Sequence, residues 1–141
     1  MKIGFTCSTF DLLHAGHVQM LREAKSQCDY LMCGLQIDPN VDRPQKNKPI
    51  QTVVERYTQL KAVRYVDEII PYETEEELLA LLRHLPVDIR VIGEDYKDKE
   101  FTGKDDVPVY YNKRQHEFST SGLRDRIKLS SRETFSQEWR L

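Results

Sequence analysis

The chain has 141 residues, of which 39% are hydrophobic, so it is long enough to bury one core and is predicted to fold as a single domain. Its 21 basic and 23 acidic residues give a net charge of −2, which argues against a general affinity for nucleic acid or an anionic membrane. The three cysteines form no metal-type pair, and neither an apolar signal segment nor a stretch of membrane-spanning length is present. The composition therefore predicts a cytoplasmic protein with reduced thiols.

The first part of the chain alternates between strand and helix patterns. Residues 2–7 are predicted to form a strand, residues 15–27 an amphipathic helix, and residues 30–35 a second strand. The second strand is apolar throughout, as expected of a strand that is covered on both faces. Together these elements predict a β-α-β unit with two parallel strands.

The same alternation continues along the chain. Residues 38–49 mix Pro, Asn, Asp and Lys and are predicted to form a loop. Thr52 with Glu55 is typical of a capping box, which starts a helix that runs to about residue 63. Thr74 is predicted to start a further helix, whose acidic first turn suits the positive end of the helix dipole. The remaining predicted strands are residues 66–70, 88–92 and 107–111.

This order of elements predicts an α/β fold, a Rossmann-like, doubly wound, five-stranded parallel sheet with helices on both faces. Ligands in such sheets bind at the carboxyl ends of the strands, and the first strand ends at residues 8–10. The folded domain is predicted to cover residues 1–129, followed by a C-terminal tail at 130–141. The apolar residues of the tail fit either a short docked helix or a disordered end, and they are Phe135, Trp139 and Leu141.

Two histidines, His14 and His17, stand where the first strand gives way to the first helix. Their spacing places both imidazoles on one helix face, while the free N–H groups and the positive dipole of the first turn attract an anion. Gly16 lets a phosphate approach the backbone without a Cβ in the way. The alternative is a buried pair or a two-point metal site, but no third His or Cys stands at ligand spacing nearby. The pattern therefore indicates a phosphate site.

This first motif resembles that of a known family. Thr9-Phe10-Asp11 followed by His14-x-Gly16-His17 resembles the signature of the small nucleotidyltransferases, and it matches the cytidylyltransferases closely. The resemblance implies that the two histidines donate hydrogen bonds to phosphate oxygens and stabilise the transition state without a covalent intermediate. It also implies that the backbone at Thr9 and Phe10 lies against the nucleotide. Asp11 would hold the loop, although a simple helix or turn cap is an equal alternative.

A second motif agrees with the first. Residues 114–121 resemble the family's C-terminal Arg-x-x-Gly-Ile-Ser-Thr-Thr segment, with Glu117 and Phe118 standing where Gly and Ile are usual. Residues 64–71 are also similar to a family segment, and the whole resemblance extends over residues 1–128. It implies a catalytic contact between Arg114 and the phosphates. The hydroxyl residues that would bind the triphosphate at a helix start are Ser119, Thr120 and Ser121.

Further basic and acidic residues receive roles from the same resemblance. Lys46 would bind the acceptor, and Lys48 would bind the nucleotide and take part in catalysis. Alternatively, the two lysines are solvated loop charges, and Arg43 could serve instead. Arg64 would lie near the nucleotide and a subunit interface, unless it forms a structural salt bridge. Asp95, in a segment similar to a Gly-Asp-Asp-Trp motif, would contact the nucleotide or belong to a plain surface turn.

The resemblance implies an enzyme that transfers CMP from CTP to a small phosphorylated alcohol, first of all sn-glycerol 3-phosphate, giving CDP-glycerol and pyrophosphate. Mg²⁺ would enter with the triphosphate, without a metal site of its own in the protein. The family forms homodimers, and the apolar strand at 66–70 could serve such an interface.

The acceptor side of the motif set is incomplete. The family's aromatic residue and lysine are missing from residues 74–78, and residues 71–97 are also similar to adenylyltransferases that act on sugar phosphates. An adenylyl- or cytidylyltransferase acting on a sugar phosphate or a phosphoethanolamine-type acceptor therefore stays open. So does a nucleotide-binding module without turnover.

Overall fold

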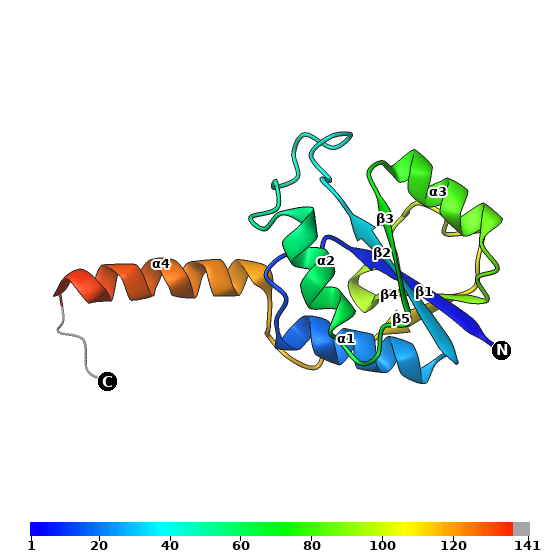
Figure 1. The fold of residues 1–141 in the computed structure, drawn as a ribbon, viewed down its shortest axis with the longest axis horizontal. Helices are drawn as coiled ribbons and strands as arrows, with labels where there is room; N and C mark the ends of the chain where they lie inside the picture. Colours follow the sequence, from blue (N-terminus) through cyan, green and yellow to red (C-terminus); the bar gives the residue numbers. More distant parts are fainter. Residues whose placement is uncertain (137–141) are drawn as a thin grey trace.

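The centre of the molecule is a five-stranded sheet (Figure 1). The computed structural model describes residues 1–136, and every neighbouring pair of strands is parallel, in the order β3-β2-β1-β4-β5. The direction of strand order reverses beside β1, which creates a switch point at the carboxyl ends of the strands. This confirms the predicted doubly wound α/β fold. The strands are β1 (Ile3–Ser8), β2 (Tyr30–Gln36), β3 (Glu68–Tyr72), β4 (Ile89–Gly93) and β5 (Val109–Asn112).

Helices cover both faces of the sheet. On one face Leu21 and Ala24 of α1 (Ala15–Ser26) and Leu60 of α2 (Val53–Lys61) enter one apolar cluster with Leu31 of β2. On the opposite face α3 (Glu75–His84) packs Leu78 and Leu82 against Phe5 of β1. Figure 1 shows α1 and α2 on the side of the sheet away from α3. None of the helices within residues 1–136 is long and apolar enough to cross a membrane.

The helix starts follow the local sequence. Thr52 Oγ1 accepts the Glu55 N–H at 3.2 Å while the Glu55 carboxylate accepts the Thr52 N–H at 3.0 Å, which confirms the predicted capping box. Thr74 Oγ1 likewise accepts the Glu77 N–H and caps α3. Strand β3 runs two residues further than expected and contains Pro71, which an edge strand tolerates because one side of its backbone has no partner strand.

The last helix, α4 (Thr120–Ser136), projects away from the sheet (Figure 1). It follows a single-turn helix, η1 (Glu94–Tyr96), and strand β5. The expected boundary between domain and tail, at residue 129, falls inside α4. The side chains of Phe135, Trp139 and Leu141 lie outside the described residues, so the docking of the tail stays a prediction.

Candidate functional site

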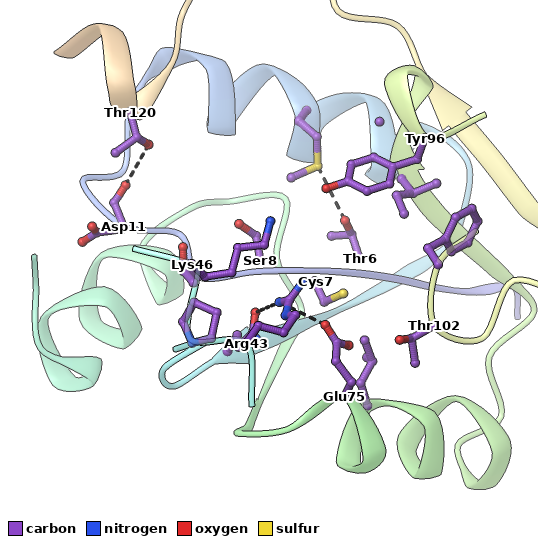
Figure 2. Close-up of a pocket in the computed structure, with 18 of the residues that line it drawn as sticks. Thr6, Cys7, Ser8, Asp11, Arg43, Lys46, Glu75, Tyr96, Thr102 and Thr120 are labelled. Atoms are coloured by element: carbon purple, nitrogen blue, oxygen red, sulfur yellow. Dashed lines mark hydrogen bonds and ion pairs between the residues drawn. The ribbon is translucent and has the colours of Figure 1, made fainter. Parts of the chain in front are cut away.

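A cavity of about 680 Å³ opens at the carboxyl ends of the strands (Figure 2). Asp11 and Thr120 lie at one end of it, which we call the α4 end, and Glu75 and Thr102 lie at the other, which we call the α3 end (Figure 2). The cavity is therefore bordered by elements from both halves of the sheet, as the switch point predicts. Of the site residues expected from the sequence, those that line it are Thr9, Asp11, Lys46, Thr120 and Ser121.

The turn between β1 and α1 is held in an unusual backbone conformation. Phe10 and Leu12 both have positive φ, at 50° and 51°. L-residues rarely adopt this left-handed region, and such strain persists where the surroundings fix the chain. Here Ser8 Oγ accepts the Phe10 N–H at 3.3 Å and Gln51 Oε1 accepts the Leu12 N–H at 2.7 Å. The Phe10 ring is fully buried in the core, so this residue anchors the turn.

Asp11 joins three segments at the α4 end. Its carboxylate is 4% exposed and accepts the N–H groups of Ile50 and Gln51 at 2.9 and 3.0 Å. The same carboxylate pairs with Arg124 of α4 at 3.1 Å, and the Asp11 carbonyl accepts a hydrogen bond from Thr120 Oγ1 at 3.3 Å. Asp11 therefore holds the loop before α2 and the start of α4 against the turn. A simple helix or turn cap would make only local contacts.

His14 and His17 form a capping box made of imidazoles. His14 Nδ1 accepts the Gly16 N–H at 3.0 Å, and His17 Nδ1 accepts the His14 N–H at 3.2 Å. The ring centroids lie 4.0 Å apart. A neutral imidazole that accepts at Nδ1 carries its hydrogen on Nε2. Each ring therefore keeps one Nε2–H donor for a ligand.

Both imidazoles are neutral at pH 7. Burial above all, together with the neighbouring His14, lowers the pKa of His17 to about 4, while the Asp11 carboxylate opposes the shift. Burial also lowers the pKa of His14, with His116 and Arg114 acting in the same direction. The pair consequently offers oriented dipoles, and the positive charge near it comes from Arg114.

The second motif folds onto the first. Ser119 Oγ accepts the Gly122 N–H at 2.9 Å and caps α4, and a Cβ placed on Gly16 would lie 3.0 Å from His116 Cε1. The exposed Arg114 donates to the Phe118 carbonyl at 2.9 Å. Glu117 has no positive φ, so the backbone does not need the glycine that the family motif has at this position. The two motifs, about a hundred residues apart, therefore meet at the start of α1.

Other expected site residues lie away from the cavity lining. Lys48, Arg64 and Asp95 are exposed and do not line it, and the Arg64 guanidinium lies over the Tyr65 ring at 5.1 Å. Phe10, His14, Gly16, His17, Arg114 and Ser119 border the α4 end without lining the cavity itself. In the strand expected to serve an interface, Ile69 packs against the core.

Sequence reasoning named Arg43 as an alternative to the loop lysines but missed the group of buried donors to which it belongs. Four buried side-chain nitrogen atoms have no hydrogen-bond partner within the described residues, and all four belong to residues that line the cavity. Two of them could have been found from the sequence: Arg90 stands inside an apolar strand, and Arg124 lies about one turn after the start of α4. The four atoms are Gln36 Nε2, Arg43 Nε, Arg90 Nε and Arg124 Nε.

Arg56 is a further residue that the sequence did not reveal. It is 2% exposed, and its guanidinium donates to the carbonyls of Thr9 at 3.0 Å and of Gln36 and Ile37 at 2.6 Å each. These carbonyls terminate β1 and β2, so Arg56 fixes the ends of two strands beside the cavity.

The acidic residues of the cavity are largely engaged. Asp11 pairs with Arg124, and Glu75 pairs with Arg43 at 3.0 Å. Among residues 1–136 no group of three or more His, Cys, Asp or Glu side chains could hold a metal ion. A Mg²⁺ ion, which prefers oxygen ligands, would fit here on the phosphate oxygens of a nucleotide.

Comparisons with known proteins agree with this geometry. The family model described as cytidylyltransferase-like matches residues 5–126. The glycerol-3-phosphate cytidylyltransferase of Bacillus subtilis (strain 168) is 35% identical over 127 residues, which cover 90% of this chain and 98% of that protein. The bifunctional protein HldE of Caulobacter sp. (strain K31) is 39% identical over 114 residues, which cover 80% of this chain; the chain spans only 23% of that longer relative.

Two solved structures share the fold. The lipopolysaccharide core biosynthesis protein from Thermoplasma volcanium GSS1 superposes with a TM-score of 0.65 at 22% identity, covering 84% of this chain and 99% of that one. The pantoate-β-alanine ligase from Francisella tularensis superposes with a TM-score of 0.59 at 18% identity, covering 91% of this chain and 69% of that one. At these identities the likeness concerns the fold alone.

Proposed function

The chain belongs to the cytidylyltransferase-like family, and we propose that it transfers CMP from CTP to a small phosphorylated alcohol. The observation that carries the proposal is the pair of neutral imidazoles whose Nε2–H donors are fixed at the start of α1. The second motif meets them there, and the cavity beside them has room for a nucleotide and an acceptor. These features suit a reaction in which positioning and electrostatic stabilisation do most of the work.

In the proposed reaction an oxygen of the acceptor phosphate attacks the α-phosphorus of CTP. The new bond joins that oxygen to the α-phosphorus, the bond from the α-phosphorus to the bridging oxygen breaks, and pyrophosphate leaves with the electron pair. His14 and His17 donate from Nε2 to the oxygens on which negative charge develops. Arg114 adds positive charge beside them. No covalent intermediate is needed.

The remaining groups divide between the two substrates. The start of α4, with Ser121 and Arg124 lining the cavity, would bind the β- and γ-phosphates. Lys46, on the loop across the cavity, would bind the acceptor (Figure 2). Mg²⁺ entering with CTP would neutralise part of the triphosphate charge.

We propose sn-glycerol 3-phosphate as the first acceptor to test. The support is the Bacillus subtilis relative, named for this acceptor, of which the chain covers 98%. A sugar phosphate or a phosphoethanolamine-type acceptor is the second candidate. It is favoured by the start of α3, where Glu75 pairs with Arg43 at the cavity and the expected aromatic residue and lysine are missing.

A homodimer belongs to the same proposal. Val66 and Ile69, in the segment expected to form the interface, pack on the core and are partly buried, while β3 keeps one edge without a partner strand. Two apolar side chains are more exposed than these: Ile50 (60% exposed) in the loop before α2, and Val54 (71% exposed) on α2. Sedimentation at micromolar concentration tests the proposal, and a species of 16.6 kDa would contradict it.

The activity is tested by measuring pyrophosphate release with CTP, ATP, GTP and UTP in turn, against sn-glycerol 3-phosphate, sugar phosphates and phosphoethanolamine. We expect turnover with CTP and a phosphorylated acceptor, and its loss in excess chelator. Release with ATP alone would make the protein an adenylyltransferase. Binding of CTP without release in any combination would favour a nucleotide-binding module.

A further inference from the structure

A buried arginine stands in the wall of the cavity at the α3 end. Arg90, the second residue of β4, is 3% exposed and lines the cavity. Its guanidinium donates to the Thr102 carbonyl and to Cys7 Sγ, the latter at 3.6 Å, and lies over the Phe101 ring at 5.1 Å. Its Nε has no partner. All of these neighbours are neutral, so none of them compensates the charge.

No carboxylate within residues 1–136 forms a salt bridge with Arg90. The acidic residues of the cavity are engaged elsewhere or exposed: Glu75 pairs with Arg43, Asp11 pairs with Arg124 at the α4 end, and the Glu100 side chain is 90% exposed. An unpaired buried charge is costly unless a partner arrives. Because Arg90 lies in a cavity wall, a bound ligand can supply that partner.

Neighbouring donors make this end of the cavity suitable for an oxygen-rich group. Gln36 Nε2 and Arg43 Nε also lack partners, and Arg43 is tied to Gln36 through its Nη2 at 3.3 Å (Figure 2). At the opposite end Arg124 is paired with Asp11, and Arg114 is exposed to solvent rather than buried.

We infer that the acceptor carries a second anionic group, besides the phosphate that receives CMP, and that Arg90 binds this group at the α3 end. The inference rests on the proposed function, since it takes the other end of the acceptor to be the reacting phosphate. A carboxylate or a second phosphate has the required chemistry. A simple polyol phosphate presents a hydroxyl at this position and leaves the charge of Arg90 uncompensated.

Arg90 also tethers the loop between η1 and β5 through Thr102, so a structural role has to be separated from binding. The chain offers a matched control. Arg83 of α3 ties the same loop through Asp106 at 3.1 Å and does not line the cavity. Arg83→Gln therefore removes an arginine and a tether of this loop without changing the cavity.

The test uses two probes that differ in one group. L-3-phosphoglycerate, which has the same arrangement at C2 as sn-glycerol 3-phosphate, has a carboxylate where the latter has a hydroxymethyl group. Each is titrated calorimetrically into the wild type, Arg90→Gln, Arg90→Lys and Arg83→Gln, in the presence of a non-hydrolysable CTP analogue. Glutamine removes the charge and keeps a donor for the Thr102 carbonyl, so this variant should fold, which circular dichroism checks.

We expect the wild type to bind the carboxylate probe about tenfold or more tightly than the alcohol probe, as a charge-assisted contact predicts. Arg90→Gln should bind both probes equally, Arg90→Lys should keep part of the preference, and Arg83→Gln should keep all of it. Equal binding or no binding of the probes by the wild type would overturn the inference, as would an unchanged preference in Arg90→Gln. Failure of the proposed function would appear separately, as absence of CTP binding or of pyrophosphate release.

Discussion

The two ends of the cavity are built in different ways. At the α4 end the motif residues make contacts that are short in sequence: His14 and His17 bond to backbone groups within the same turn, and Ser119 caps α4, while Asp11 joins this turn to distant segments. At the α3 end the groups that meet come from distant elements, with Gln36 on β2 and Arg90 on β4. The first kind of site is encoded by a short motif. The second depends on how the whole sheet is assembled.

The two ends of the cavity also differ in their electrostatics. At the α4 end the imidazoles carry lowered pKa values and Arg124 pairs with Asp11, so the remaining positive charge there is that of the exposed Arg114. The α3 end keeps a buried guanidinium without a carboxylate. A preorganised set of neutral donors suits a transition state, in which charge develops during the reaction. An uncompensated charge suits the recognition of a substrate that is already charged.

Replacing a histidine of the α4 end should have the largest effect on turnover. His14→Ala or His17→Ala is expected to lower kcat about a hundredfold or more, since one oriented donor to a developing charge is worth about 3 kcal/mol. Steady-state pyrophosphate release measures the change. His84→Ala is the matched control, because His84 is exposed at the end of α3 and does not line the cavity. Near-normal turnover in a folded His14 or His17 variant would remove that histidine from the mechanism.

The burial of His17 should also appear in the stability of the protein. Its pKa is about 4 in the folded state against about 6.5 in the unfolded chain, so the unfolded chain takes up this proton first as the pH falls. The free energy of unfolding therefore keeps its full value above pH 6.5. It falls by up to about 3 kcal/mol as the pH drops from 6.5 towards 4. Urea unfolding of the wild type and of His17→Gln at several pH values measures the difference. Parallel pH profiles for the two proteins would contradict the burial of a neutral His17.

The same contrast explains what the sequence could predict. The α/β alternation, the Thr52 capping box and the turn that carries His14 and His17 follow from patterns of a few residues, and the structure confirms the fold. The strained φ of Phe10 and the hydrogen bonds from Arg56 to the carbonyls of Thr9, Gln36 and Ile37 could not be predicted, because they depend on long-range packing. Arg90 was visible as a charge in an apolar strand, but its place in the cavity required the strand order.

Asp11 connects the turn to the other segments of the α4 end, and its removal should loosen them. Asp11→Asn keeps the shape of the side chain but places an amide against one of the two backbone N–H donors and leaves Arg124 unpaired. We expect the free energy of unfolding to fall by about 2 kcal/mol, as for a buried hydrogen bond to a charged group. Denaturant unfolding measures it, with Asp38→Asn as the control, since Asp38 caps a local turn at Asn40. An equal loss of unfolding free energy in Asp11→Asn and Asp38→Asn would contradict the inference that Asp11 holds these segments together.

The smallest effect concerns two lysines of one loop, and it tests whether this loop moves during turnover. Lys46 lines the cavity, whereas Lys48, two residues further along, is exposed and does not. Lys46→Ala should raise the acceptor KM about tenfold and leave the CTP KM unchanged, because one charge-assisted contact is lost. Lys48→Ala should change either constant less than about threefold if the loop keeps this conformation during turnover. A larger loss in Lys48→Ala, above all in the CTP KM, would mean that the loop moves to bring Lys48 to the phosphates. The loop would then complete the site only when substrate binds.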